Sequence, residues 1–220
     1  MDIEKKQNSK LYRFFDWLYK LLVMNVFTIM SILPIVTAYP AIVAMYATIK
    51  NDMKEPGIFK IYFSNYKKYF LKSLFLGLII IASIAIVGFA FYFYAYAIPQ
   101  DSFNEIVFQM GVAVMILLAI VIIMLSVHIP LITITFNALS VMEIIRTSFF
   151  ISFRYFITTL ILFVMFVLSI VGIIALPIWF LFGVSLPTLL GIKFTSTVYY
   201  KFEQIDLESI LQQAEDDLDE

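Results

Sequence analysis

The feature that most constrains this chain is a set of four long stretches without a charged side chain. They cover residues 21–49, 73–100, 106–142 and 155–192, with His128 counted as neutral. Each stretch exceeds the roughly 20 residues that an α-helix needs to cross the hydrocarbon core of a bilayer. Membrane-spanning strands are about 10 residues long and alternate apolar with polar residues, which these stretches do not. The sequence therefore predicts an all-α, polytopic helical membrane protein of the cell membrane.

Composition and charge agree with this class. Hydrophobic residues make up 62% of the chain and charged residues 14%, whereas soluble chains average roughly 45–50% and about 25%. A formal net charge of −1 gives no basic field that would attract nucleic acid. The chain contains no cysteine, which excludes disulfides, iron–sulfur clusters and thiol chemistry.

Prolines are expected to divide these stretches into about five spans. Pro34 or Pro40 interrupts the first span and Pro130 the third, because proline lacks an N–H and clashes with the preceding helical turn. The last stretch is too long for one crossing, and Pro177 is its expected break. The second span is expected from about residue 69, after a lysine-rich interfacial helix. These elements form one transmembrane domain over residues 1–201, with the fifth span at 179–199 and an acidic tail at 202–220.

Two windows of similar sequence predict an internal repeat. KYFL at 68–71 resembles RYFI at 154–157, Phe63 then corresponds to Phe149, and Pro40 corresponds to Pro130. The expected repeat units are residues 11–98 and 105–175. Two spans in each unit would relate the units by an axis along the membrane normal. The alternative is chance similarity, because apolar segments draw on few residue types.

The positions of the fifteen lysines and arginines allow two topologies. With five spans, ten of these residues lie in the loops after the first and third spans and at the C-terminus. The excess of basic residues on cytoplasmic loops then places the C-terminus in the cytoplasm and the N-terminus outside. A re-entrant first hairpin, turning at residues 34–40, would instead place all fifteen in the cytoplasm. The five-span topology is the first expectation, although the basic N-terminus conflicts with it.

Three polar residues in the predicted spans are candidate functional or structural positions: Asn25, His128 and Asn137. Ionisable groups inside membranes often serve function, so His128 can act as a proton relay or ligand. The sequence favours a neutral histidine that donates to a carbonyl left free by Pro130. Asn25 and Asn137 are expected to hydrogen-bond between helices. No catalytic, cofactor or metal pattern accompanies them, so we expect no enzyme activity and no cofactor.

The segment LPIVTAYPAIVAMY at 33–46 carries a family resemblance. Together with Asn25 before it, and a basic loop and KKYFLKSLFLGL after it, the segment resembles the YesL family of bacterial integral membrane proteins. The closing TSTVYYKFE at 195–203 is similar to the end of that family. The resemblance implies a small multi-span protein of unknown activity, encoded near genes for carbohydrate uptake and degradation. It implies no catalytic residue.

Two functions remain as expectations. The first is a non-enzymatic accessory protein that binds a membrane partner, either a carbohydrate transporter subunit or a second copy of itself. The scarcity of ionisable groups along the spans favours it, because such groups mark transport pathways. The alternative is a small-molecule permease with proline-broken helices near His128 and Asn137, since transporters expose backbone groups at such breaks.

Overall fold

The computed structural model describes residues 10–32, 34–51, 57–97, 105–175, 179, 182–196, 198 and 200. These residues are helical or lie in turns, and no strand occurs among them, which confirms the helical membrane class. A further helix occupies residues 185–196. The other elements are α2 (Lys10–Ile32), the 3-10 turn η1 (Ile35–Thr37), α3 (Ala38–Asn51), α4 (Ile58–Tyr92), the π-helical turn η2 (Phe93–Ala97), α5 (Glu105–Thr135), α6 (Val141–Arg154) and α7 (Phe156–Ala175).

The break predicted at Pro34 or Pro40 falls at Pro34. The backbone N–H of Thr37 donates to the carbonyl of Pro34 at 2.7 Å. The Thr37 hydroxyl lies 2.6 Å from the Ser31 carbonyl and 2.8 Å from the Pro34 carbonyl. Pro40 is the third residue of α3, where its missing N–H would have had no helical acceptor. A helix therefore begins just before Pro40 rather than ending there.

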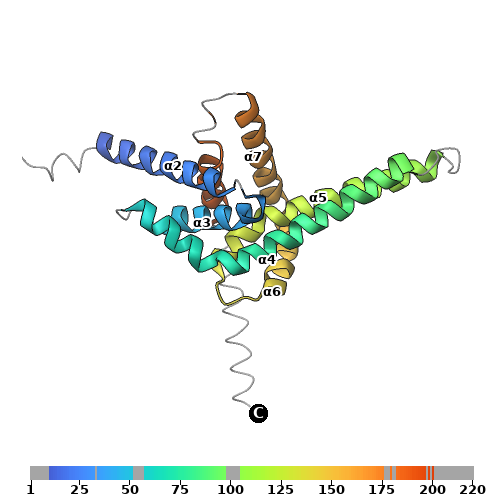
Figure 1. Cartoon of the computed structure of the whole chain (residues 1–220), viewed down its shortest axis with the longest axis horizontal. Coiled ribbons are helices and arrows are strands. Elements are labelled where there is room, and N and C mark those ends of the chain that lie inside the picture. Colours follow the sequence, from blue (N-terminus) through green and yellow to red (C-terminus); the bar gives the residue numbers. More distant parts are fainter. Residues whose placement is uncertain are drawn as a thin grey trace, which may run out of the picture.

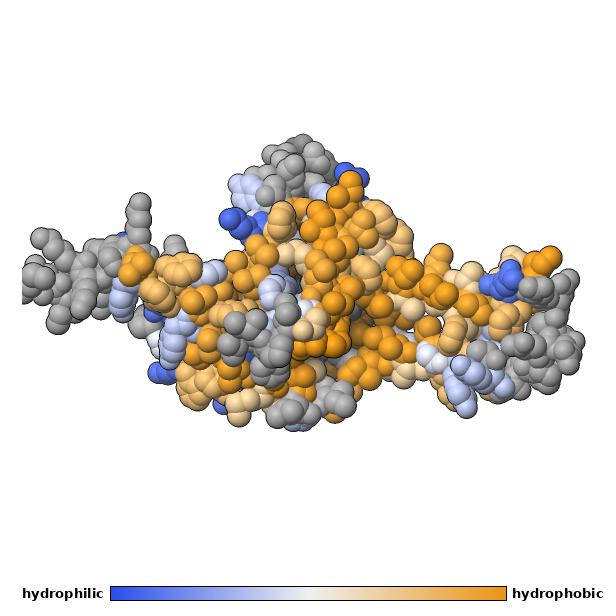
Figure 2. All heavy atoms as spheres, turned by 90° about the horizontal axis from the view of Figure 1, so that it is seen from above, coloured by the Kyte–Doolittle hydropathy of each residue, from blue (hydrophilic) through white to orange (hydrophobic). Residues whose placement is uncertain are grey.

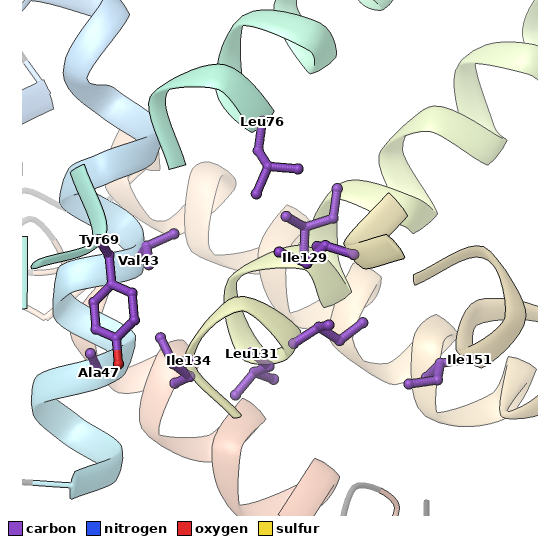
Figure 3. Packing of buried hydrophobic residues seen from close by; sticks show 10 residues of the cluster. Val43, Ala47, Tyr69, Leu76, Ile129, Leu131, Ile134 and Ile151 are labelled. Atoms are coloured by element: carbon purple, nitrogen blue, oxygen red, sulfur yellow. The ribbon is translucent and has the colours of Figure 1, made fainter. Parts of the chain in front are cut away.

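α3 lies at the centre of the fold and contacts α2, α4 and α5. A Cβ atom at Gly77 of α4 would lie 2.6 Å from the Cβ of Tyr39, so only glycine allows α3 and α4 to approach this closely. Val43 and Ala47 of α3 are buried against neighbouring helices (Figure 3). The same buried cluster includes Tyr69 and Leu76 of α4, Ile129, Leu131 and Ile134 of α5, and Ile151 of α6.

α4 is continuous where the sequence predicts an interfacial helix followed by a separate span. It begins after Gly57, whose φ of 80° is in the left-handed region that favours glycine. No proline interrupts residues 58–92, so the two predicted elements form one helix about 52 Å long at 1.5 Å per residue. Its buried residues all lie in its first part, and the last of them is Gly77.

α5 also continues through a predicted break. Pro130 lies inside this helix, which ends at Thr135, so the prediction of a third span broken at Pro130 is wrong. Asn137 consequently lies beyond the end of α5, exposed in the turn before α6, and not in a span. α6 then starts with a reciprocal cap. The Glu143 N–H donates to the Ser140 hydroxyl, and the Ser140 N–H donates to the Glu143 carboxylate at 2.6 Å.

Four helices of the described residues are long and apolar enough to cross a membrane: α2, α4, α5 and α7. The sequence predicts about five. Within and just after the fifth predicted span, residues 185–196, 198 and 200 are helical. The break predicted at Pro177 lies outside the described residues.

The outer parts of α4 and α5 project away from the other helices (Figure 1). We call residues 81–97 and 105–120 the α4–α5 hairpin. None of its described side chains is buried, and its visible surface is largely apolar (Figure 2). Near its tip, the ring of Tyr94 stacks on Phe108 with centroids 5.3 Å apart. The two helices of the hairpin therefore contact each other there, while most of their surface faces outward.

The beginning of α2 and the end of α3 lie at the same end of their hairpin (Figure 1). These ends carry Lys10 and Lys50, as in the re-entrant alternative, so we expect both to face the cytoplasm. An impermeant thiol reagent applied to intact cells should then leave Gln7→Cys and Asn51→Cys unlabelled and react with Ser102→Cys. Labelling of Gln7→Cys would support five spans with an external N-terminus instead.

Candidate functional site

The first polar contact lies where Pro130 interrupts the hydrogen bonds of α5. Proline deprives the carbonyl four residues earlier of its helical N–H, and here that carbonyl belongs to Ser126. The hydroxyl of Tyr39, at the start of α3, donates to this carbonyl at 3.0 Å. Tyr39 thus has the role that the sequence assigns to His128. The bond fixes the start of α3 against α5.

His128 is completely buried and binds α7. Its Nε2 lies 2.8 Å from the hydroxyl oxygen of Thr159. That hydroxyl has a single proton, and the carbonyls of Ser152 and Tyr155 lie 3.1 and 3.2 Å from it. We therefore assign the proton of the ring to Nε2, so that His128 donates to Thr159 and Thr159 donates to one of the carbonyls.

Thr159 lies at a second irregular point, the break between α6 and α7. Tyr155 separates the two helices with φ −114° and ψ 49°, outside the helical region. Carbonyls at the end of a helix lack helical N–H partners, and the Ser152 carbonyl obtains the Thr159 hydroxyl in their place. One histidine–threonine pair therefore links the proline-containing part of α5 to the α6–α7 break.

Asn25 makes a separate contact from the middle of α2. It is completely buried, and its side-chain oxygen accepts the backbone N–H groups of Val184 and Ser185 at 3.0 and 3.1 Å. These N–H groups lie at the start of the 185–196 helix and have no helical acceptor. Asn25 therefore caps this helix, as an N-cap residue does from within its own helix. The contact joins segments 160 residues apart.

Two buried hydroxyls in the same region have no hydrogen-bond partner among the residues that the structure describes. They belong to Thr28 and Ser185, and both side chains are completely buried. Thr28 follows Asn25 by three residues, which places both on one side of α2. A buried hydroxyl without a partner costs free energy. The apolar contacts and the Asn25 cap, rather than these hydroxyls, therefore hold the 185–196 helix in place.

Two lysines bind the end of α5. The Lys50 ammonium donates to the Thr135 hydroxyl at 2.6 Å, and the Lys72 ammonium donates to the carbonyls of Asn137 and Leu139 at 2.8 and 2.7 Å. Cations favour a helix C-terminus because its last carbonyls lack N–H partners. Asn137 contributes its backbone carbonyl to these contacts, and the residue is exposed.

Glu143 adds a negative charge beside these lysines. Its carboxylate accepts the Ser140 N–H and hydroxyl and lies near Arg146 and Lys72, which together hold its pKa below the usual range. A carboxylate with a lowered pKa stabilises the fold above its unfolded pKa. That stabilisation is lost as the pH falls through the lowered value. Glu143 is therefore ionised at neutral pH.

The three predicted polar residues thus have different partners. Asn25 caps the 185–196 helix, His128 binds Thr159, and Asn137 lies in the α5–α6 turn. The structure does not bring them into one site. Among the described residues, no three His, Asp or Glu side chains are grouped closely enough to hold a metal ion. The described polar contacts hold helices together.

Sequence reasoning missed Tyr39 and Thr159, which complete the contacts at the two irregular points. Tyr39 lies in the apolar proline segment, where a buried tyrosine hydroxyl needs a partner. Thr159 corresponds in the repeat to Ser73, whose hydroxyl donates to the Tyr69 carbonyl at 2.6 Å. The Thr159 hydroxyl lies 3.2 Å from the equivalent carbonyl of Tyr155. The aligned repeat windows therefore contained a signal for Thr159.

Comparison with known proteins identifies similarity over part of the chain. The family model described as "Protein of unknown function, DUF624" matches residues 18–91, from α2 almost to the end of α4. No curated protein and no solved structure shows significant similarity to the chain. The match covers α3, Tyr39 and Asn25, and it leaves out His128 and Thr159.

Proposed function

We propose that this protein is a non-enzymatic accessory protein of the cell membrane that binds a carbohydrate-uptake transporter through its α4–α5 hairpin. The observation that carries the proposal is the absence of any buried side chain among the described residues of this hairpin. Two long apolar helices project from a core that does not cover them (Figure 1). Helices in membranes associate through close packing of such surfaces.

The polar contacts support the same proposal. His128, Thr159 and Asn25 are buried and are engaged in hydrogen bonds within the chain. A transport pathway would use polar groups of this kind along a route for the substrate. The carbohydrate partner comes only from the resemblance of residues 33–46 to the YesL family, since the matched family is one of unknown function.

Photo-cross-linking in native membranes tests the partner. A photoreactive residue at Ile86 or Leu117, which are 69% and 61% exposed on the hairpin, should cross-link a transporter subunit in stoichiometric yield. The matched control is Ile157 of α7, which is 74% exposed and should give no such product. A product containing only a second copy of this chain would replace the transporter with self-association. Equal yields from all three positions would show lipid-facing surfaces without a specific partner.

The second candidate is a small-molecule permease near His128 and Asn137. One observation favours it: the His128–Thr159 pair joins two irregular helical points, and transporters place substrate sites at such points. The exposed position of Asn137 beyond α5 removes its other predicted residue from the span. In liposomes containing this protein alone we expect no saturable sugar flux. Flux that His128→Ala abolishes would establish the permease and contradict the accessory function.

A further inference from the structure

The first part of α4 and the whole of α6 present the same surface at equivalent positions. Tyr69 and Tyr155 are aligned by the repeat and lie 86 residues apart, and the same spacing relates the residues before them. A basic residue, a phenylalanine and a second basic residue recur on both helices, and all are exposed. The pairs are Lys60 with Arg146, Phe63 with Phe149, and Lys68 with Arg154.

The buried sides of these segments correspond as well. Ser73 and Thr159 are both completely buried. Their hydroxyl oxygens lie 2.6 and 3.2 Å from the carbonyls of Tyr69 and Tyr155, four residues earlier. Two further pairs, Ile58 with Ile144 and Leu76 with Leu162, are also buried. Since the buried sides agree in register, the exposed residues occupy equivalent outward positions on the two helices.

The chemistry of this surface combines positive charge with a large apolar group. Residues at i, i+3 and i+8 lie on one side of a helix. No acidic residue occurs at 58–72, and Glu143, the one acidic residue of α6, is bonded to Ser140. Lysine and arginine contact anionic headgroups, while phenylalanine enters the boundary between headgroups and acyl chains.

The position of the surface also fits a bilayer. Arg154 ends α6, and the apolar helix α7 begins at Phe156. Lys72 is the last charged residue of α4, and the uncharged part of the helix follows it. Each basic surface therefore lies immediately before a membrane-crossing stretch, at the level of the headgroups. A soluble polyanion could contact both surfaces only by approaching the membrane, where the headgroups already lie.

We propose that residues 60–68 of α4 and 146–154 of α6 form two equivalent binding surfaces for anionic phospholipid headgroups. The basic side chains contact the lipid phosphate, and Phe63 and Phe149 insert beside the acyl chains. The two surfaces hold lipids at related places around one core. This binding does not depend on the transporter partner, and it is measured on the isolated protein.

Spin-labelled lipids test the proposal on the purified full-length protein in phosphatidylcholine bilayers. Electron paramagnetic resonance gives the affinity for phosphatidylglycerol relative to phosphatidylcholine, and we expect a preference for phosphatidylglycerol. Lys60→Gln/Lys68→Gln and Arg146→Gln/Arg154→Gln should each lower this preference about five- to 25-fold, since each of the two basic residues removed contributes up to roughly five-fold in affinity. The two double variants should have similar effects.

The charge-matched control is Arg13→Gln/Lys193→Gln, which removes two exposed basic residues outside both surfaces and should keep the preference. Exchanging lysine for arginine at Lys60 and Lys68 should also keep it, which separates lost charge from lost folding. An unchanged preference in both double variants would overturn the proposal, as would an equal loss in the control. A loss confined to one helix would overturn the equivalence of the two surfaces. Cross-linking of a protein at Phe63 or Phe149 with unchanged lipid preference would assign these surfaces to a protein instead.

Discussion

Replacing Asn25 with alanine is expected to lower the free energy of unfolding by about 2–4 kcal/mol. The backbone N–H groups of Val184 and Ser185 then lose their acceptor, and each buried donor without a partner costs about 1–3 kcal/mol. Titration of the protein in detergent with dodecyl sulfate, followed by circular dichroism, measures the change. Because the chain has no cysteine, the thiol reactivity of Leu189→Cys reports separately on release of the 185–196 helix.

Thr28→Val is the matched control for this prediction. Thr28 lies on the same side of α2 and is completely buried, and its hydroxyl, near that of Tyr62, makes no well-aligned hydrogen bond among the described residues. Its replacement by a residue of similar shape should change the free energy of unfolding by less than about 0.5 kcal/mol or increase it. If Thr28→Val destabilised the protein as much as Asn25→Ala, general packing of α2 would explain both effects. Unchanged reactivity at Leu189→Cys in the Asn25→Ala background would also contradict the cap.

Tyr39→Phe is expected to lower the free energy of unfolding by about 1–2 kcal/mol, because the Ser126 carbonyl loses the Tyr39 hydroxyl. Pro130→Ala should remove this dependence. Alanine at 130 supplies the N–H that proline lacks, so the Ser126 carbonyl regains a helical partner. In the Pro130→Ala background, Tyr39→Phe should therefore cost less than about 0.5 kcal/mol. The difference is a coupling energy of about 1 kcal/mol in a double-mutant cycle.

The cycle separates hydrogen bonding from packing. The Tyr39 side chain also lies against Gly77, and phenylalanine retains that contact. If Tyr39→Phe lowered the free energy of unfolding equally in both backgrounds, the Tyr39 hydroxyl would not be the partner of the Ser126 carbonyl. Gly77→Ala, whose Cβ would lie 2.6 Å from that of Tyr39, should destabilise both backgrounds alike and provides the control for packing.

The helical membrane class could be predicted from the sequence because charge-free stretches report directly on the cost of placing charges in hydrocarbon. The first helical break was predictable for a local reason, because Pro34 lacks an N–H and clashes with the helical turn immediately before it. The continuity of α4 was not predictable in this way. Lysines beside aromatic residues at 58–70 indicate a position at the membrane surface. This pattern is the same in a helix that ends there and in one that continues into the membrane.

The candidate site depends on contacts that no local pattern contains. Pro130 lies inside a helix, and the Ser126 carbonyl that it leaves without an N–H accepts the hydroxyl of Tyr39, which lies 87 residues before Ser126. Asn25 has its partner 160 residues later, at the start of the 185–196 helix. His128 was identified from its residue type, but its partner, Thr159, depends on the break at Tyr155. The similar segment KYFL at 68–71 lies within the continuous helix α4 and causes no such break. Similar sequence therefore gave different backbone in the two repeat windows.

The exposed α4–α5 hairpin also determines how this protein responds to the thickness of its bilayer. From Tyr69 to Tyr92, α4 spans about 35 Å at 1.5 Å per residue, slightly more than the roughly 30 Å hydrocarbon core. A helix longer than the core tilts, at a cost of fractions of a kcal/mol per Å. Because α4 is one continuous helix and its residues up to Gly77 pack in the core, a change in its tilt is transmitted to the contacts around α3. Membrane thickness is therefore expected to act, through the angle of this helix, on the packing between α4 and α3.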